Sequence, residues 1–124
     1  MESLIVITNN PMSKREFEEK YKTEFIEGST MEVYKKARNY IHDGHRLLTH
    51  PIMGSIKPNE TPYRTVVITK KYFQGLDLQS IELIEEAMHT TEKFLKDFGI
   101  PNWGEKVLED FQLIDYDLIY HALT

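Results

Sequence analysis

The side chains best suited to chemistry lie close together in one segment, residues 44–63, which reads GHRLLTHPIMGSIKPNETPY. Between its prolines and glycines, this segment carries groups that can exchange protons or hydrogen-bond a ligand, namely His50, Ser55, Lys57, Asn59, Glu60 and Thr61. A surface loop of this length is uncommon in a small domain unless it binds something, because ordering an unpaired backbone costs entropy. We therefore interpret residues 50–63 as a functional loop.

Acid–base catalysis is one reading of this loop. His50 and Glu60 are the candidate catalytic residues, as general base and general acid, with Lys57 as a clamp for an anion. No spacing rule links the three residues. A solvated Lys57–Glu60 pair, and a His50 that hydrogen-bonds a loop carbonyl, explain the same pattern. The sequence therefore leaves open whether the protein is an enzyme.

The sequence gives no support to a metal site, a serine nucleophile or a phosphate-binding loop. His42, His45 and His50 form the only histidine cluster, but a glycine helix stop separates the first two, and the last two point to opposite faces of an extended segment. We therefore expect no metal site. Ser55 lacks the flanking pattern of a nucleophile elbow, and residues 44–57 match no phosphate-binding loop, so we expect no cofactor either.

Composition narrows the class of protein. A chain of 124 residues fits one domain, so we expect residues 1–124 to fold as a single unit. The chain has no cysteine, which excludes disulfides and thiolate chemistry. A net charge of −5 argues against a nucleic-acid partner. No apolar run approaches the roughly 20 residues of a membrane span, and the start of the chain lacks the basic region of a signal peptide. We expect a cytoplasmic protein with no membrane partner.

The hydrophobic pattern predicts four strands. The continuous apolar run of residues 4–8 is typical of a central strand covered on both faces, and the more polar residues 23–27 are typical of an edge strand. Residues 46–49 and 65–69 complete the set, with the long loop between them. Helical patterns cover residues 14–21, 29–44, 77–99 and a last stretch from Asn102, whose predicted inner face is Val107, Phe111, Ile114, Leu118 and Ala122.

Alternating strands and helices predict a small three-layer α/β domain with a four-stranded, mainly parallel sheet of order 2-1-3-4 and about four helices. An antiparallel fourth strand is equally compatible, since no helix separates it from the third. Ligands bind beyond the carboxyl ends of strands at the switch point of such a sheet, which brings the turn after the first strand beside the long loop. The predicted ligand-binding residues are Asn9, Asn10, His50, Ser55, Lys57, Asn59 and Glu60.

Two further features have alternative readings. Gly28, Ser29 and Thr30 begin a helix, where free N–H groups can bind an anion, although an ordinary capping box explains the same residues. Tyr116, Tyr120 and Trp103 lie off the Phe111 stripe of the last helix, so they are candidates for an interface with a partner or in a homodimer; packing within the chain is equally plausible. The loop residues Ile52, Met53 and Ile56 likewise suit an interaction module unless they are covered.

The sequence resembles the GrdX family over nearly the whole chain. The resemblance is carried by Thr8–Pro11, by EFIEGS at residues 24–29, and above all by GHRLLTHP and GSIKPNETPY within residues 44–63. It implies a small protein encoded beside the glycine, sarcosine and betaine reductase genes of anaerobic amino-acid-fermenting bacteria. The resemblance supplies no catalytic residues. Without cysteine, such a protein cannot relay electrons through thiols in that system.

These observations lead to two hypotheses. The first is a non-catalytic accessory protein that binds a small polar or anionic ligand, or a reductase component, through the 50–63 loop. The second is a small enzyme that acts on an amino-acid-derived or acyl-phosphate substrate, with His50 and Glu60 in acid–base roles.

Overall fold

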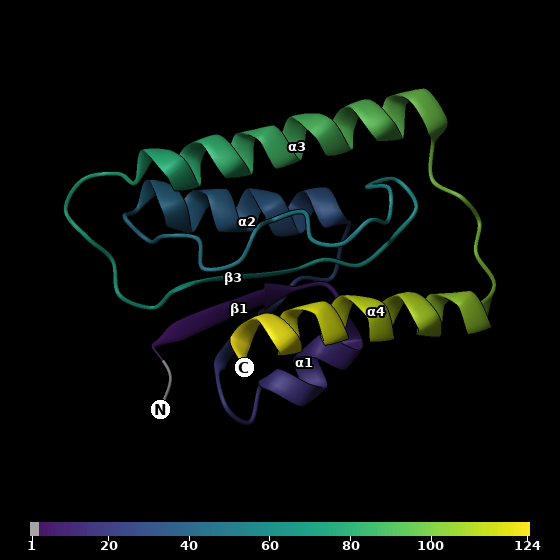
Figure 1. The fold of residues 1–124 in the computed structure, drawn as a ribbon, viewed down its shortest axis with the longest axis horizontal. Helices are drawn as coiled ribbons and strands as arrows, with labels where there is room; N and C mark the ends of the chain where they lie inside the picture. Colours follow the sequence, from purple (N-terminus) through teal and green to yellow (C-terminus); the bar gives the residue numbers. More distant parts are fainter. Residues whose placement is uncertain (1–2) are drawn as a thin grey trace.

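Helices cover both faces of a three-stranded sheet in the computed structural model, which describes residues 3–124. In chain order the elements are β1 (Leu4–Thr8), α1 (Pro11–Phe17), β2 (Lys22–Phe25), α2 (Thr30–His42), β3 (Thr65–Thr69), α3 (Leu78–Phe98) and α4 (Glu105–Leu123). Figure 1 shows α2 and α3 on one side of the sheet, and α1 and α4 on the other. The predicted α/β class with four helices is confirmed.

The central position of β1 follows from its sequence. All five residues of the run LIVIT are buried, because α helices cover both faces of the strand. Ile5 and Ile7 point to the α2 and α3 side, and Leu4 and Val6 point to the α1 and α4 side. The shorter and more exposed β2 pairs with β1 in parallel at the edge of the sheet, as its polar sequence predicts.

The predicted four-stranded, mainly parallel sheet of order 2-1-3-4 is wrong. The sheet has the order β2-β1-β3, and β1 is parallel to β2 but antiparallel to β3. Residues 46–49, which we expected beside β1, form only an isolated bridge from Leu47 to Ile68 on the outer side of β3. That bridge is antiparallel, in agreement with the alternative that the sequence left open for these two segments.

Burial and hydrogen bonding explain this arrangement. Val66, Val67 and Ile68 of β3 are fully buried, whereas Leu48 is 51% exposed. The more apolar run therefore takes the place beside β1, where burial is greatest. At the outer edge side chains replace part of the backbone ladder, since Leu47 N–H donates to Ser80 Oγ and Val67 N–H donates to Thr49 Oγ1.

The caps fix where the helices begin and end. Ser29 caps α2 and Asp77 caps α3 through their side chains, and Gly44 and Gly99 follow these helices with positive φ, at the ends of the predicted helical ranges. Helix α1 begins earlier than expected. The side chain of Asn10 accepts from Met12 N–H and Pro11 takes the first helical position, where its missing N–H costs nothing.

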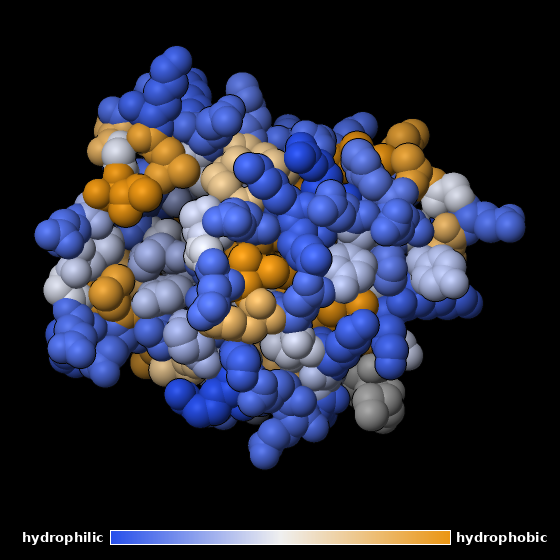
Figure 2. All heavy atoms as spheres, turned by 180° about the vertical axis from the view of Figure 1, so that it is seen from behind, coloured by the Kyte–Doolittle hydropathy of each residue, from blue (hydrophilic) through white to orange (hydrophobic). Residues whose placement is uncertain are grey.

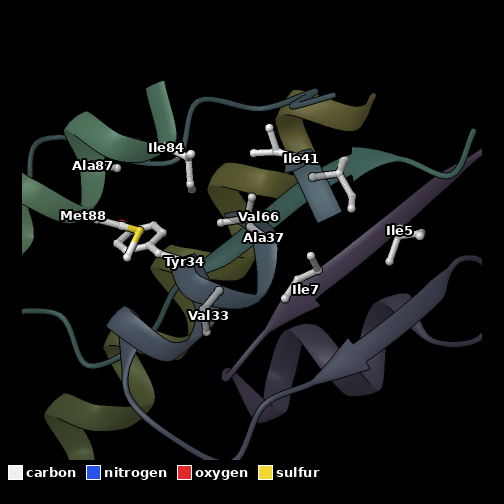
Figure 3. Packing of buried hydrophobic residues seen from close by; sticks show 11 residues of the cluster. Ile5, Ile7, Val33, Tyr34, Ala37, Ile41, Val66, Ile84, Ala87 and Met88 are labelled. Atoms are coloured by element: carbon white, nitrogen blue, oxygen red, sulfur yellow. The ribbon is translucent and has the colours of Figure 1, made fainter. Parts of the chain in front are cut away.

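Two apolar clusters hold the layers together. The larger one lies between the sheet and the helices α2 and α3. Figure 3 shows its side chains, which come from β1, β3, α2 and α3, gathered around Val66 and Tyr34. The smaller cluster lies under α1 and α4. On α4 the predicted inner face is partly wrong, because Val107, Ile114 and Ala122 are exposed. The buried residues of this helix are instead Asp115 and Ile119.

Candidate functional site

The 50–63 loop has no regular secondary structure, as predicted, yet hydrogen bonds hold it at several points. Each bond joins a side chain to a backbone carbonyl, and together they tie the loop to β1, to α2 and to the connection between α3 and α4. The bonds are Tyr34 Oη to Pro51 O (3.0 Å), Asn59 Nδ2 to Gly99 O (3.0 Å), Trp103 Nε1 to Glu60 O (2.6 Å) and Asn9 Nδ2 to Pro62 O (2.9 Å). These bonds hold the loop in a defined position against the rest of the fold.

Asn9 connects three segments at the end of β1. Its Nδ2 donates to the carbonyl of Gly28 at 3.0 Å as well as to that of Pro62, and its Oδ1 accepts from the N–H of Arg64 at 2.8 Å. The amide is thus fully used within the chain. Its effect is to hold the turn before α2 beside the end of the 50–63 loop.

A cavity of about 190 Å³ lies between these two segments, and we call it the α2–loop cavity. One wall is the start of α2 and the other is residues 58–62, while the end of α3 and the residue after Gly99 close it. The lining residues are Gly28, Ser29, Thr30, Pro58, Asn59, Thr61, Pro62, Leu95 and Ile100. Most of this wall is apolar, so its few polar groups determine which ligands can bind.

Asn59 is the most informative polar group in this wall. The residue is only 6% exposed, and its Nδ2 donates to the carbonyl of Gly99. Its Oδ1 is buried and has no hydrogen-bond partner. A buried polar atom without a partner is costly, by about 1–3 kcal/mol. Because Asn59 lines the α2–loop cavity, a small shift of this wall would let its acceptor pair with a donor that enters the cavity.

The first turn of α2 contributes a different kind of group. The N–H groups in the first turn of a helix have no carbonyl partner within the helix, and the helix dipole makes this end positive. Ser29 Oγ satisfies the N–H of Glu32 at 3.3 Å, and the N–H groups before it have no such cap. The carboxylate of Glu32 lies over Gly28, since a methyl group on Gly28 would be 2.5 Å from Glu32 Oε1.

A buried polar layer lies one helical turn behind the cavity. Tyr34 follows Thr30 by four residues on α2, and Thr91 precedes Leu95 by four on α3, so each pair shares a helix face. Burial raises the pKa of Tyr34, and the nearby positive charge of Arg64 opposes this rise. Arg64 is 5% exposed and takes part in none of the ion pairs found among residues 3–124. Its Nη2 and Thr91 Oγ1 have no hydrogen-bond partner.

Asn10 belongs to a second buried network, on the α1 and α4 side. Its Nδ2 donates to Asp115 Oδ2 at 2.9 Å and to the carbonyl of Gln112 at 2.9 Å. Asp115 Oδ2 also accepts from Thr65 Oγ1 at 2.6 Å. Burial raises the pKa of Asp115, against the effect of these hydrogen bonds and of Arg64. The network joins α4 to the sheet, and Asn10 has a structural role in it.

We expect Asp115 to make stability depend on pH. Because its pKa is higher in the folded than in the unfolded chain, its contribution is complete below the ordinary value of about 4. The contribution is lost as pH rises through the raised folded pKa. Asp115→Asn keeps an acceptor and removes the charge. In urea denaturation between pH 4 and pH 8, the stability of this variant relative to the parent should therefore rise with pH. The exposed Asp97→Asn is the control, and a difference that stays flat for Asp115→Asn would contradict the assignment.

The other predicted site residues are spread over the loop. His50 is exposed, and its Nδ1 accepts from Ile52 N–H at 3.1 Å. It lines a second cavity of about 230 Å³, beside the Asp77 cap of α3; Glu60 is not part of that lining. Lys57 is exposed with its Nζ 5.9 Å from the ring centre of Phe98, and Ser55 is exposed. No described cavity brings His50 and Glu60 together as an acid–base pair.

The histidine cluster is dispersed in the same way. His45 is buried, and its Nδ1 lies 2.7 Å from the carbonyl of Thr69, while His42 is exposed at the end of α2. Among residues 3–124, no group of three His, Cys, Asp or Glu side chains is arranged to hold a metal ion.

The aromatic residues of α4 and the turn before it pack largely within the chain. The ring centres of Tyr116 and Phe17 are 5.1 Å apart, and those of Trp103 and Phe111 are 5.4 Å apart. Tyr120 is exposed and contacts Tyr116. Figure 2 shows apolar atoms on the back face in separate groups among hydrophilic ones. These contacts give no support to a homodimer or to a particular protein partner.

Comparison with known proteins places the chain in a family. Residues 5–124 match the family model described as GrdX-like protein. The chain belongs to the GrdX-like family. No curated protein and no solved structure matches it. Within the described part of this GrdX-like chain, no helix combines the length and the apolar character needed to cross a membrane.

Sequence reasoning found part of this site and missed the rest. It singled out Asn59 and the helix start at Gly28–Thr30, but in separate arguments, and it did not bring them together. It missed Leu95 and Ile100, because no local signal shows that the end of α3 closes a cavity. It also missed Asp115, for which a signal exists: a carboxylate at helical spacing from the apolar residues Phe111, Leu118 and Ile119.

Proposed function

We propose that this GrdX-like chain is a non-catalytic accessory protein that binds a small polar ligand in the α2–loop cavity. The observation that carries the proposal is Asn59, which lines the cavity and whose buried Oδ1 has no hydrogen-bond partner. Natural proteins rarely leave such an atom unsatisfied unless a ligand or water completes it. The adjoining N–H groups of α2 add a second recognition element. The 50–63 loop contributes by forming one wall.

An accessory role in the glycine, sarcosine and betaine reductase system is the second part of the proposal. Membership of the GrdX-like family supports it. The reductase substrates are therefore the first ligands to test. Because the chain has no cysteine, electron relay through thiols is excluded. The role that we propose in such a system is to bind and deliver a ligand.

Thermal unfolding with and without ligands tests the proposal. The panel is glycine, sarcosine, betaine, acetyl phosphate and inorganic phosphate. A ligand at 100 times its dissociation constant adds about 2.7 kcal/mol to the stability of the folded state. For a domain of this size that corresponds to a rise in Tm of roughly 10 °C. We expect at least one of the compounds to raise the Tm in a concentration-dependent way.

A cavity-filling variant assigns the effect to the site. Leu95→Trp places a larger side chain in the cavity wall and should abolish the rise in Tm. Lys93→Trp, on the exposed face of the same helix, is the matched control and should keep it. The proposal fails if no compound raises the Tm, or if both variants respond like the parent protein.

A further inference from the structure

We infer that the α2–loop cavity selects a small zwitterion with a protonated amine, that is, a free α-amino acid with a short apolar side chain. It should reject simple anions and simple amines of the same size. This inference rests on the proposed function, since it names the ligand class of the same cavity.

The start of α2 suits the carboxylate of such a ligand. The uncapped N–H groups of its first turn are hydrogen-bond donors, and the helix dipole favours negative charge at this end. Thr30, the first helical residue, lines the cavity. Arg64 adds positive charge behind the wall: it is buried, it takes part in none of the ion pairs found among residues 3–124, and its charge opposes the rise in pKa that burial causes at Tyr34 and Asp115.

Two groups at the same cavity suit the protonated amine. Asn59 Oδ1 is a buried acceptor without a partner, and its orientation is fixed because Nδ2 is bonded to Gly99. An N–H donor of the ligand would satisfy it, whereas a carboxylate oxygen would repel it. Glu32 adds a negative charge at the rim, over Gly28. The negative charge of Glu32 repels a simple anion at this helix end. In a zwitterion, the ammonium group compensates this repulsion.

The rest of the lining limits the remainder of the ligand. Pro58, Pro62, Leu95 and Ile100 offer no hydrogen bonds from their side chains, so additional polar groups would be desolvated without compensation. A cavity of about 150 Å³ holds a molecule of the size of benzene, so the α2–loop cavity, at about 190 Å³, suits a ligand with only a few more heavy atoms. A short apolar side chain fits both limits.

The same lining disfavours phosphate and acyl phosphates. A group with two negative charges needs several charged or N–H donors to replace its hydration. No lysine or arginine lines the α2–loop cavity, and Glu32 lies beside it. The acyl-phosphate class of ligand is therefore the least suited to this site.

Three compounds of nearly equal shape test the inference by isothermal titration calorimetry on the full chain. L-alanine carries both charged groups, isobutyrate replaces the ammonium by a methyl group, and isopropylamine replaces the carboxylate by a methyl group. L-alanine should bind at least about tenfold more tightly than either analogue, because each analogue leaves one charged hydrogen bond unmade. N,N,N-trimethylalanine, which has no N–H to donate, should bind as weakly as isobutyrate.

Two variants assign the amine to its partners. Asn59→Leu removes the acceptor and should weaken L-alanine binding about tenfold while changing isobutyrate binding less than about twofold. Glu32→Gln, at an exposed position, should weaken L-alanine and strengthen isobutyrate. The exposed Glu82→Gln on α3 is its control and should change neither. If Asn59→Leu does not fold, the three-ligand comparison on the parent chain decides the question alone.

The outcomes separate this inference from the proposed function. Tighter binding of L-alanine, lost in Asn59→Leu, supports both. If isobutyrate, isopropylamine or phosphate binds at least as tightly as L-alanine, and Leu95→Trp abolishes that binding, the ligand class is wrong and the cavity remains a binding site. If L-alanine does not bind, the inference is overturned, whatever the thermal-shift panel shows.

Discussion

Asn9→Ala is expected to lower the free energy of unfolding by about 2–4 kcal/mol and to abolish ligand binding in the α2–loop cavity. The substitution leaves three backbone groups without their partner, the carbonyls of Gly28 and Pro62 and the N–H of Arg64. A buried polar group left unpaired costs about 1–3 kcal/mol, and the carbonyl of the exposed Gly28 can bind water instead. Urea denaturation gives the stability, and L-alanine titration gives the binding.

The control is Asn102→Ala, because Asn102 is exposed. Its free energy of unfolding should change by no more than about 0.5 kcal/mol. Asn9→Asp is a second, graded test. It keeps the acceptor for Arg64 but loses both donors, so it should remain folded with the cavity walls no longer tied together. If Asn9→Ala is as stable as the control, Asn9 does not position the two walls.

Ile68→Ala should have the largest effect on stability, about 2–5 kcal/mol, while Leu48→Ala should cost less than about 1 kcal/mol. Ile68 lies in β3, is 0% exposed and packs in the cluster beneath α2 and α3. Leu48 is half exposed at the outer edge of β3, although its backbone N–H donates to the carbonyl of Val67. The two substitutions thus compare a strand of the sheet with a segment that only bridges to it.

The measurement is chemical denaturation of both variants beside the parent chain, with the denaturant slope checked for two-state behaviour. If residues 46–49 lay next to β1 in a four-stranded sheet, as the sequence pattern predicts, Leu48 would be buried and Leu48→Ala would cause a large loss of stability. A loss of 2 kcal/mol or more on Leu48→Ala would therefore contradict the observed strand order.

Local signals made much of the fold predictable. The apolar run of β1, the caps at Ser29 and Asp77, and the glycine stop at Gly44 each depend on neighbouring residues alone. The place beside β1 depends on a competition between two distant runs, which no local pattern records. The prediction of the inner face of α4 failed for a related reason. Apolar residues lie on several faces of this helix, and the hydrogen-bond network of Asp115 determines which face turns inward.

The sequence predicted the region of the site but not the residues that together form it. Unusual length and proline content identified the 50–63 loop, and Asn59 in it does line a cavity. The sequence correctly placed Asn9 and Asn10 at the end of β1, but their side-chain amides bond to the chain itself and not to a ligand. This bonding follows from their burial, which their residue type does not reveal. The opposite wall comes from α2 and α3, far away in the sequence.

The most direct test of the account is to locate the bound ligand by ¹H–¹⁵N NMR spectroscopy of the full chain. L-alanine, sarcosine and isobutyrate are titrated in turn, and the backbone amide shifts of each residue are followed. Saturable shifts with L-alanine are expected at Ser29, Thr30, Asn59 and Thr61 in the walls of the α2–loop cavity, and none at His50 or Ser80 in the second cavity. Absence of shifts in the cavity walls with all three compounds, or shifts centred on His50, would contradict the proposed site.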